Sequence, residues 1–134
     1  MFKQKKHIFA EKMVKTHKDL RVYVKSFDAA MAIFRMTKSF PKEEVYSLTD
    51  QIRRSSRSVS ANIAEAFRRR RYPKLFVLKL NESEAEAAET QNWLDFSLKS
   101  EYISHSTHQN AIQTYDDIIG MLVNMQKNPQ KWHL

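Results

Sequence analysis

The chain has 134 residues, and its 23 lysines and arginines outnumber its 15 acidic residues, so the formal net charge is +8 and the sequence pI is about 9.8. It contains no cysteine, one glycine and three prolines. This composition excludes disulfides and cysteine-ligated metals, and it favours one all-helical domain because few tight turns are possible. No segment has the apolar run of a signal peptide or the length of a membrane span, so we expect a soluble, cytoplasmic protein.

Residues 1–18 are rich in lysine and break the helical period, which predicts a flexible, basic N-terminal arm. Ile8 and Phe9 are its candidate docking side chains, and contact with nucleic acid is an alternative role for the arm. A first helix is predicted from about Asp19 to Lys38. Seven residues form its predicted core face, namely Leu20, Tyr23, Val24, Phe27, Ala30, Met31 and Phe34.

Phe40 and Pro41 interrupt this pattern. Proline suits the first turn of a helix, and Glu43 and Glu44 complement the positive end of the helix dipole, so a second helix is predicted from Pro41 to about Arg70. At 100° per residue its predicted core-facing side chains fall within an arc of about 120°. They are Val45, Leu48, Ile52, Ser56, Val59, Ile63, Ala66 and Phe67.

A third helix is predicted from Pro73 to about Ser100, and a fourth from an N-cap at Ser104 or Ser106 to about Gln126. The third buries Phe76, Leu80, Ser83, Ala87, Leu94 and Leu98, and the fourth buries Ala111, Ile112, Tyr115, Ile119 and Leu122. Short connections between four helices predict an up-and-down antiparallel bundle over residues 19–127, followed by a tail at 128–134. Gly120 lies inside the fourth helix, where close packing would explain a residue that costs about 1 kcal/mol relative to alanine.

The third helix carries a second apolar stripe nearly opposite its core face, made of Leu75, Leu78, Ala85, Trp93 and Phe96. A lone bundle would leave this stripe in water, so we expect another subunit to cover it. Glutamates beside the stripe complement the arginines of the preceding helix, and a head-to-tail contact of that kind closes into a ring. The predicted interface comprises Leu75, Leu78, Glu82, Glu86, Glu89, Trp93 and Phe96.

The segment Gln51–Tyr72, QIRRSSRSVSANIAEAFRRRRY, contains seven arginines and one glutamate. Most of these arginines project away from the apolar stripe of the second helix, which predicts an accessible cationic surface. A surface of that kind binds nucleic-acid phosphates with little regard for base sequence. The candidate nucleic-acid residues are Arg53, Arg54, Arg57, Arg68, Arg69, Arg71 and Lys74. Tyr72, Phe76 and Trp132 could stack on unpaired bases, although ordinary packing is the favoured explanation for each of them.

The alternative is a solvated helix face, in which Glu65 pairs with Arg68 or Arg69 and other arginines bond neighbouring subunits. The protein would then be an oligomeric protein–protein scaffold without a nucleic-acid role. Exposure of the arginines after assembly separates the two hypotheses.

Nothing in the sequence predicts an enzyme, a metal or a cofactor. His105 and His108 are three residues apart but lack a nearby third ligand, and the adjacent Asp116 and Asp117 point in different directions on a helix. The carboxylates Glu65, Glu86 and Glu89 lack the Glu-x-x-His motifs of a di-iron bundle. No phosphate loop or nucleophile elbow is present.

Three strings, FPKEEVYSLTDQIRRSS, ANIAEAFRRRRY and EAAETQNWLDFSLKSEYI, span Phe40 to Ile103 and resemble the family of four-helix bundle proteins named after intervening sequences in 23S rRNA genes. Ala66, Phe67 and Glu82 depart from the glycine pattern common in that family. The resemblance implies a homopentameric ring. The architecture is also similar to the accessory proteins of diversity-generating retroelement reverse transcriptases, which implies a reverse transcriptase as a candidate partner.

Overall fold

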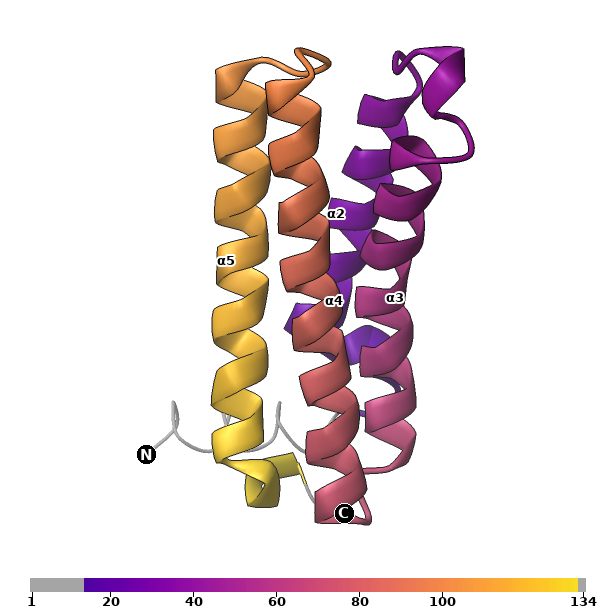
Figure 1. Cartoon of the computed structure of the whole chain (residues 1–134). Coiled ribbons are helices and arrows are strands. Elements are labelled where there is room, and N and C mark those ends of the chain that lie inside the picture. Colours follow the sequence, from indigo (N-terminus) through magenta and orange to yellow (C-terminus); the bar gives the residue numbers. More distant parts are fainter. Residues whose placement is uncertain (1–13, 133–134) are drawn as a thin grey trace.

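The computed structural model describes residues 14–132 and contains, in that range, four α-helices and no strand. The α-helices are α2 (Arg21–Thr37), α3 (Leu48–Arg68), α4 (Pro73–Lys99) and α5 (His105–Lys127). They run alternately up and down beside one another (Figure 1). Three short 3₁₀ helices, η1 (His17–Asp19), η2 (Lys42–Glu44) and η3 (Pro129–Trp132), complete the described elements. The all-α, four-helix prediction is confirmed. None of the helices within 14–132 is long and apolar enough to cross a bilayer.

The buried face of α2 differs from the predicted one. The residues that α2 buries are Val22, Ser26, Ala29, Ala30, Ile33 and Thr37. Val24, Phe27 and Met31, which were predicted to lie in the core, are instead exposed. Apolar residues occur on both sides of this helix, so periodicity alone did not identify the side that α3 covers. The prediction was wrong for those three residues, which instead form an apolar stripe on the surface of α2.

The α-helical part of the second helix also begins later than predicted. Pro41 precedes only the short η2, and Val45, a predicted core residue, is exposed. The Glu44 carboxylate accepts hydrogen bonds from the Ser47 hydroxyl at 2.6 Å and from the Tyr102 hydroxyl at 2.8 Å. These bonds, that of Ser47 first, lower the pKa of Glu44. The bond from Tyr102 holds the α2–α3 connection against the α4–α5 turn, whereas the bond from Ser47 lies within the connection.

The core is centred on the contact between α3 and α4. Its buried apolar residues from these helices are Ile52, Val59, Ile63, Ala66, Phe67, Phe76, Leu80, Ala87 and Leu94. Small polar side chains let the two backbones approach, since the hydroxyl oxygens of Ser55 and Thr90 lie 2.8 Å apart and Ser83 donates to the carbonyl of Val59 at 2.7 Å. The hydroxyls of Ser55, Ser83 and Thr90 are thereby hydrogen-bonded within the core.

Helix α5 begins as predicted, with Ser104 as the N-cap that accepts a hydrogen bond from the Thr107 amide at 3.1 Å. It buries Tyr115, Ile118, Leu122 and Met125. Gly120 is exposed, and a Cβ added there would meet no atom within 4 Å. The expected close packing at Gly120 is therefore wrong.

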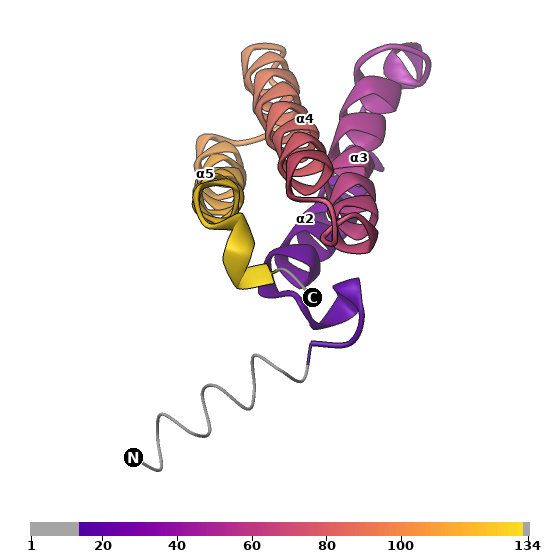
Figure 2. The ribbon, with the colours of Figure 1, turned by 90° about the horizontal axis from the view of Figure 1, so that it is seen from below.

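The described chain begins and ends at the same end of the bundle, where α3 turns into α4 (Figures 1 and 2). Val14 and Trp132, near those two ends, are partly buried against the core. Val14 belongs to the segment predicted as a flexible arm, whereas Ile8 and Phe9 of that arm lie outside the described residues.

Candidate nucleic-acid interface

Cations gather around one aromatic ring where α2 and α3 meet. The Arg53 guanidinium lies 4.8 Å from the ring centroid of Phe34, that of Arg57 lies 5.9 Å from it, and the Lys38 ammonium lies 5.0 Å from it. Arg53 also donates from Nε to the Thr37 hydroxyl at 2.8 Å. These contacts orient the side chains, since a cation–π contact at an exposed site contributes about 0.5–1 kcal/mol. Arg57 remains exposed, while Arg53 is partly buried.

The second group of cations lies at the turn between α3 and α4, residues 69–72, together with the adjoining helix ends; we call this region the elbow. Its exposed members are Arg68, Arg69, Arg71 and Lys74. Arg70 turns inward, with its guanidinium 3.6 Å from the ring centroid of Phe67 and a hydrogen bond of 3.0 Å to the Phe67 carbonyl. Burial first, and then the neighbouring charges of Arg68 and Arg71, lower the pKa of Arg70. Arg70 therefore packs against the end of α3, whereas Arg68, Arg69, Arg71 and Lys74 are exposed to solvent.

Glu65, which was expected to pair with an arginine at the end of α3, binds a lysine of α4 instead. Glu65 pairs with Lys79 at 3.1 Å, so the predicted pairing with Arg68 or Arg69 is wrong. Glu82 binds the same Lys79 ammonium at 3.1 Å. The hydrogen bonds from Lys79 to Glu82 and Glu65 raise the pKa of Lys79. Among residues 14–132, no carboxylate lies within ion-pair distance of an arginine on α3 or at its elbow. The exposed guanidinium groups among them are available to an anionic ligand, namely those of Arg54, Arg57, Arg68, Arg69 and Arg71.

Four of the arginines share one side of α3. At 100° per residue, Arg53, Arg54, Arg57 and Arg68 fall within an arc of about 100°. Arg53 and Arg68 are fifteen residues apart in the sequence, which corresponds to about 22 Å along the helix. Phosphates of one nucleic-acid strand advance about 3.4 Å each along a duplex axis, so a stripe of this length faces several of them.

The three candidate stacking residues separate clearly. Phe76 is only 1% exposed, which excludes it from stacking on a ligand. Trp132 is partly buried and packs against the core. Tyr72 is 56% exposed at the elbow, beside the arginines.

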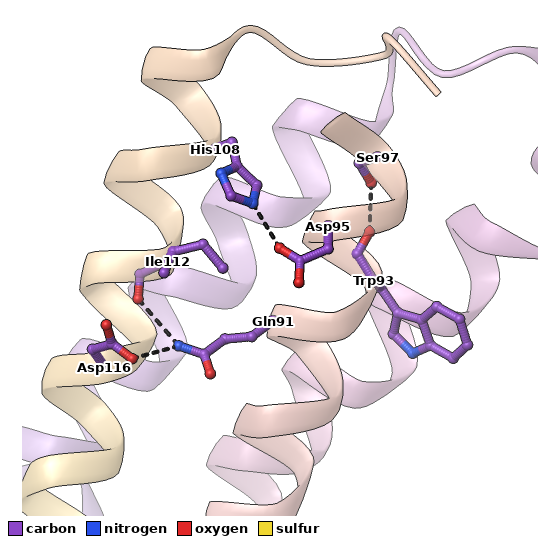
Figure 3. A network of polar contacts seen from close by, with 7 residues as sticks. All are labelled: Gln91, Trp93, Asp95, Ser97, His108, Ile112 and Asp116. Atoms are coloured by element: carbon purple, nitrogen blue, oxygen red, sulfur yellow. Dashed lines mark hydrogen bonds and ion pairs between the residues drawn. The ribbon is translucent and has the colours of Figure 1, made fainter. Parts of the chain in front are cut away.

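The predicted second stripe of α4 lies on the surface of the chain. Leu75, Leu78 and Phe96 are exposed, whereas Trp93 is partly buried and extends from α4 on the side away from α5 (Figure 3). The Trp93 indole donates to Glu89 at 3.2 Å. Of the predicted interface glutamates, Glu82 forms an ion pair with Lys79. Glu86 has a raised pKa, chiefly because it is partly buried and also because the charge of Glu89 is nearby.

The polar side of α4 faces α5 through a separate network (Figure 3). His108 lies 2.8 Å from the Asp95 carboxylate, and Gln91 donates to Asp116 at 2.8 Å. His108 on α5 is thus hydrogen-bonded to Asp95 on α4. Within the described range, no group of three or more histidine, aspartate or glutamate side chains is placed to hold a metal ion.

The chain is similar to a solved structure and matches the model of one protein family. No curated protein matches the chain. A crystal structure described as a protein of unknown function from the S23 ribosomal protein family of Bacteroides thetaiotaomicron is 31% identical, with a TM-score of 0.72, and the match covers 79% of this chain and 95% of that chain. The sequence model of the 23S rRNA-intervening sequence proteins matches residues 18–124. The chain therefore belongs to the 23S rRNA-intervening sequence protein family.

Proposed function

We propose that this protein is a non-catalytic nucleic-acid-binding accessory protein that contacts phosphates through one cationic surface. The observation that carries the proposal is a set of cationic side chains, all but one of them exposed, that have no carboxylate partner among the described residues. We call this set the arginine face, and it comprises Arg53, Arg54, Arg57, Arg68, Arg69, Arg71 and Lys74. Arg53 is its most constrained member.

Charge distribution supports the same proposal. Between Arg53 and Lys79 the chain has nine basic residues and one acidic residue, and that acid, Glu65, is paired with Lys79. Binding to phosphates releases condensed counterions, so affinity grows with each phosphate neutralised. Contacts of this kind position a nucleic acid without reading its bases. The family's name, which refers to 23S rRNA, agrees with an RNA-related role.

Self-association is a second part of the proposal. Two apolar stripes are exposed on the single chain, one on α2 around Phe27 and one on α4 around Leu78. A closed ring, which the family resemblance gives as a pentamer, would cover apolar surface and multiply the arginine face. A reverse transcriptase partner remains a prediction from architectural resemblance alone.

The test neutralises two exposed members of the arginine face, Arg57→Gln and Arg71→Gln, in one variant. We expect weaker binding to single-stranded RNA, with a salt slope shallower by roughly 0.7 for each lost phosphate contact. The control variant, Lys99→Gln with Lys127→Gln, removes the same charge from exposed positions outside the face. It should keep the wild-type slope.

Sedimentation velocity of the same variants distinguishes the scaffold alternative, which the exposed apolar stripes also support. If the arginines bond neighbouring subunits, the variant with Arg57→Gln and Arg71→Gln dissociates. If they contact phosphates, its oligomeric state equals that of the wild type while its affinity for RNA falls.

A further inference from the structure

A pocket of about 490 Å³ lies at the α3–α4 elbow, beside η1. Its lining residues are His17, Ala64, Glu65, Arg68, Arg69, Tyr72 and Lys79. Sites for small organic ligands occupy about 300–1,000 Å³, so one nucleotide fits a pocket of this size. Figure 2 views the end of the bundle that contains this elbow and η1.

The charges of the pocket select an anion. Lys79 pairs with Glu65 at 3.1 Å and with Glu82, outside the pocket lining, at 3.1 Å, so both carboxylates are directed at this one ammonium. Arg68 and Arg69 have no carboxylate within ion-pair distance among the described residues. Two guanidinium groups therefore remain for phosphate oxygens, which arginine binds in a bidentate manner.

The same pocket presents aromatic rings. Tyr72 is 56% exposed, and its amide donates to the Arg69 carbonyl at 2.8 Å, which fixes the backbone between the ring and the arginines. Pro73 follows and restricts that backbone further. The His17 ring, which also lines the pocket, is held edge-on against Tyr23, with ring centroids 4.6 Å apart.

We propose that this elbow pocket binds an unpaired nucleotide, with its phosphate on Arg68 and Arg69 and its base stacked on Tyr72. The inference rests on the proposed function and adds a ligand class to it, because a base inside a duplex is stacked on both faces and is not available to Tyr72. The arginine face thus holds either kind of strand, and the elbow pocket favours single strands.

The test measures the affinity of the wild type and of Tyr72→Leu for three probes: a single-stranded oligonucleotide, its duplex, and an abasic single strand of equal length. We expect Tyr72→Leu to weaken binding of the single strand at least about fivefold. Binding of the duplex and the abasic strand should not change. Tyr72→Phe should keep wild-type affinity, since the ring is retained.

Tyr46→Leu is the matched control, because Tyr46 is 95% exposed and precedes α3, whereas Tyr72 follows it. This variant should bind all three probes as the wild type does. Equal affinity of the wild type and Tyr72→Leu for the single strand overturns the pocket proposal, as does an equal loss for the abasic strand. Failure of the wild type to bind any probe at low salt overturns the proposed function as well, so the two failures are distinguishable.

Discussion

Gly120 occupies a position on α5 that does not require glycine. The residue is exposed, and the space around its Cα is open. Because glycine costs about 1 kcal/mol relative to alanine in a helix interior, Gly120→Ala should raise the free energy of unfolding by up to about that amount. Urea denaturation measures the change. The converse control is Ala32→Gly at an exposed position of α2, which should lower the free energy of unfolding by a similar amount. A Gly120→Ala variant that is less stable than the wild type would contradict the structure.

Glu86 predicts a dependence of stability on pH. Burial and then the charge of Glu89 raise its pKa above the ordinary value of 4.5, so the folded chain holds the proton more tightly than the unfolded chain. Stability therefore falls as pH rises from the unfolded pKa through the raised one. Glu86→Gln should be more stable than the wild type near pH 7 and no more stable at pH about 3. Urea denaturation at both values tests this, and a gain that is equal at both would contradict it.

At the scale of elements, the elbow between α3 and α4 assigns different roles to adjacent arginines. Arg70 packs on Phe67 and bonds its carbonyl, whereas Arg71 is exposed. We expect Arg70→Gln to lower the free energy of unfolding by about 1 kcal/mol, the contribution of one hydrogen bond, with part of the cation–π contact also lost. Arg71→Gln should leave stability unchanged and weaken binding to RNA. Thermal denaturation and a binding titration of both variants check the assignment, and interchanged results would refute it.

The helices themselves were largely predictable from the sequence, and the reasons for the exceptions are physical. The core face of the strongly amphipathic α3 was predicted correctly, because apolar and cationic side chains occupy opposite sides of this helix. Val45 was misplaced because the α-helix begins only at Leu48, after η2, whose Glu44 accepts a hydrogen bond from Tyr102 of a distant turn. In α2 both sides are apolar, and the buried side is decided by α3, which local periodicity does not reveal.

The candidate site was predictable in composition but not in detail. The arginines that were singled out are mostly exposed, yet the partner of Glu65 is Lys79, which comes from the next helix. Phe34 was assigned to the core but is only partly buried, and its ring contacts two arginines of α3 and the lysine that follows α2. Contacts between helices determine both outcomes, and only the packed bundle specifies them.

At the scale of the whole molecule, the exposed stripe on α4 predicts self-association. Leu78 is 51% exposed, so Leu78→Glu should leave the fold intact while it places a charge within the proposed subunit contact. We expect a lower sedimentation coefficient for this variant than for the wild type. Gln109→Glu adds the same charge at an exposed position on α5 and should sediment like the wild type. Identical sedimentation of all three proteins would place the contact elsewhere or exclude it.

The central claim is that the arginine face binds phosphates. Its most direct test is the affinity of the purified protein, at a defined oligomeric state, for labelled single-stranded RNA, duplex RNA and duplex DNA across a salt series. The account predicts binding to all three and little dependence on base sequence. The log–log salt slope should have a magnitude of about 3 or more, which corresponds to about four phosphate contacts on a single strand and about three on duplex DNA. Absence of binding at low salt, or binding that salt does not weaken, would contradict it.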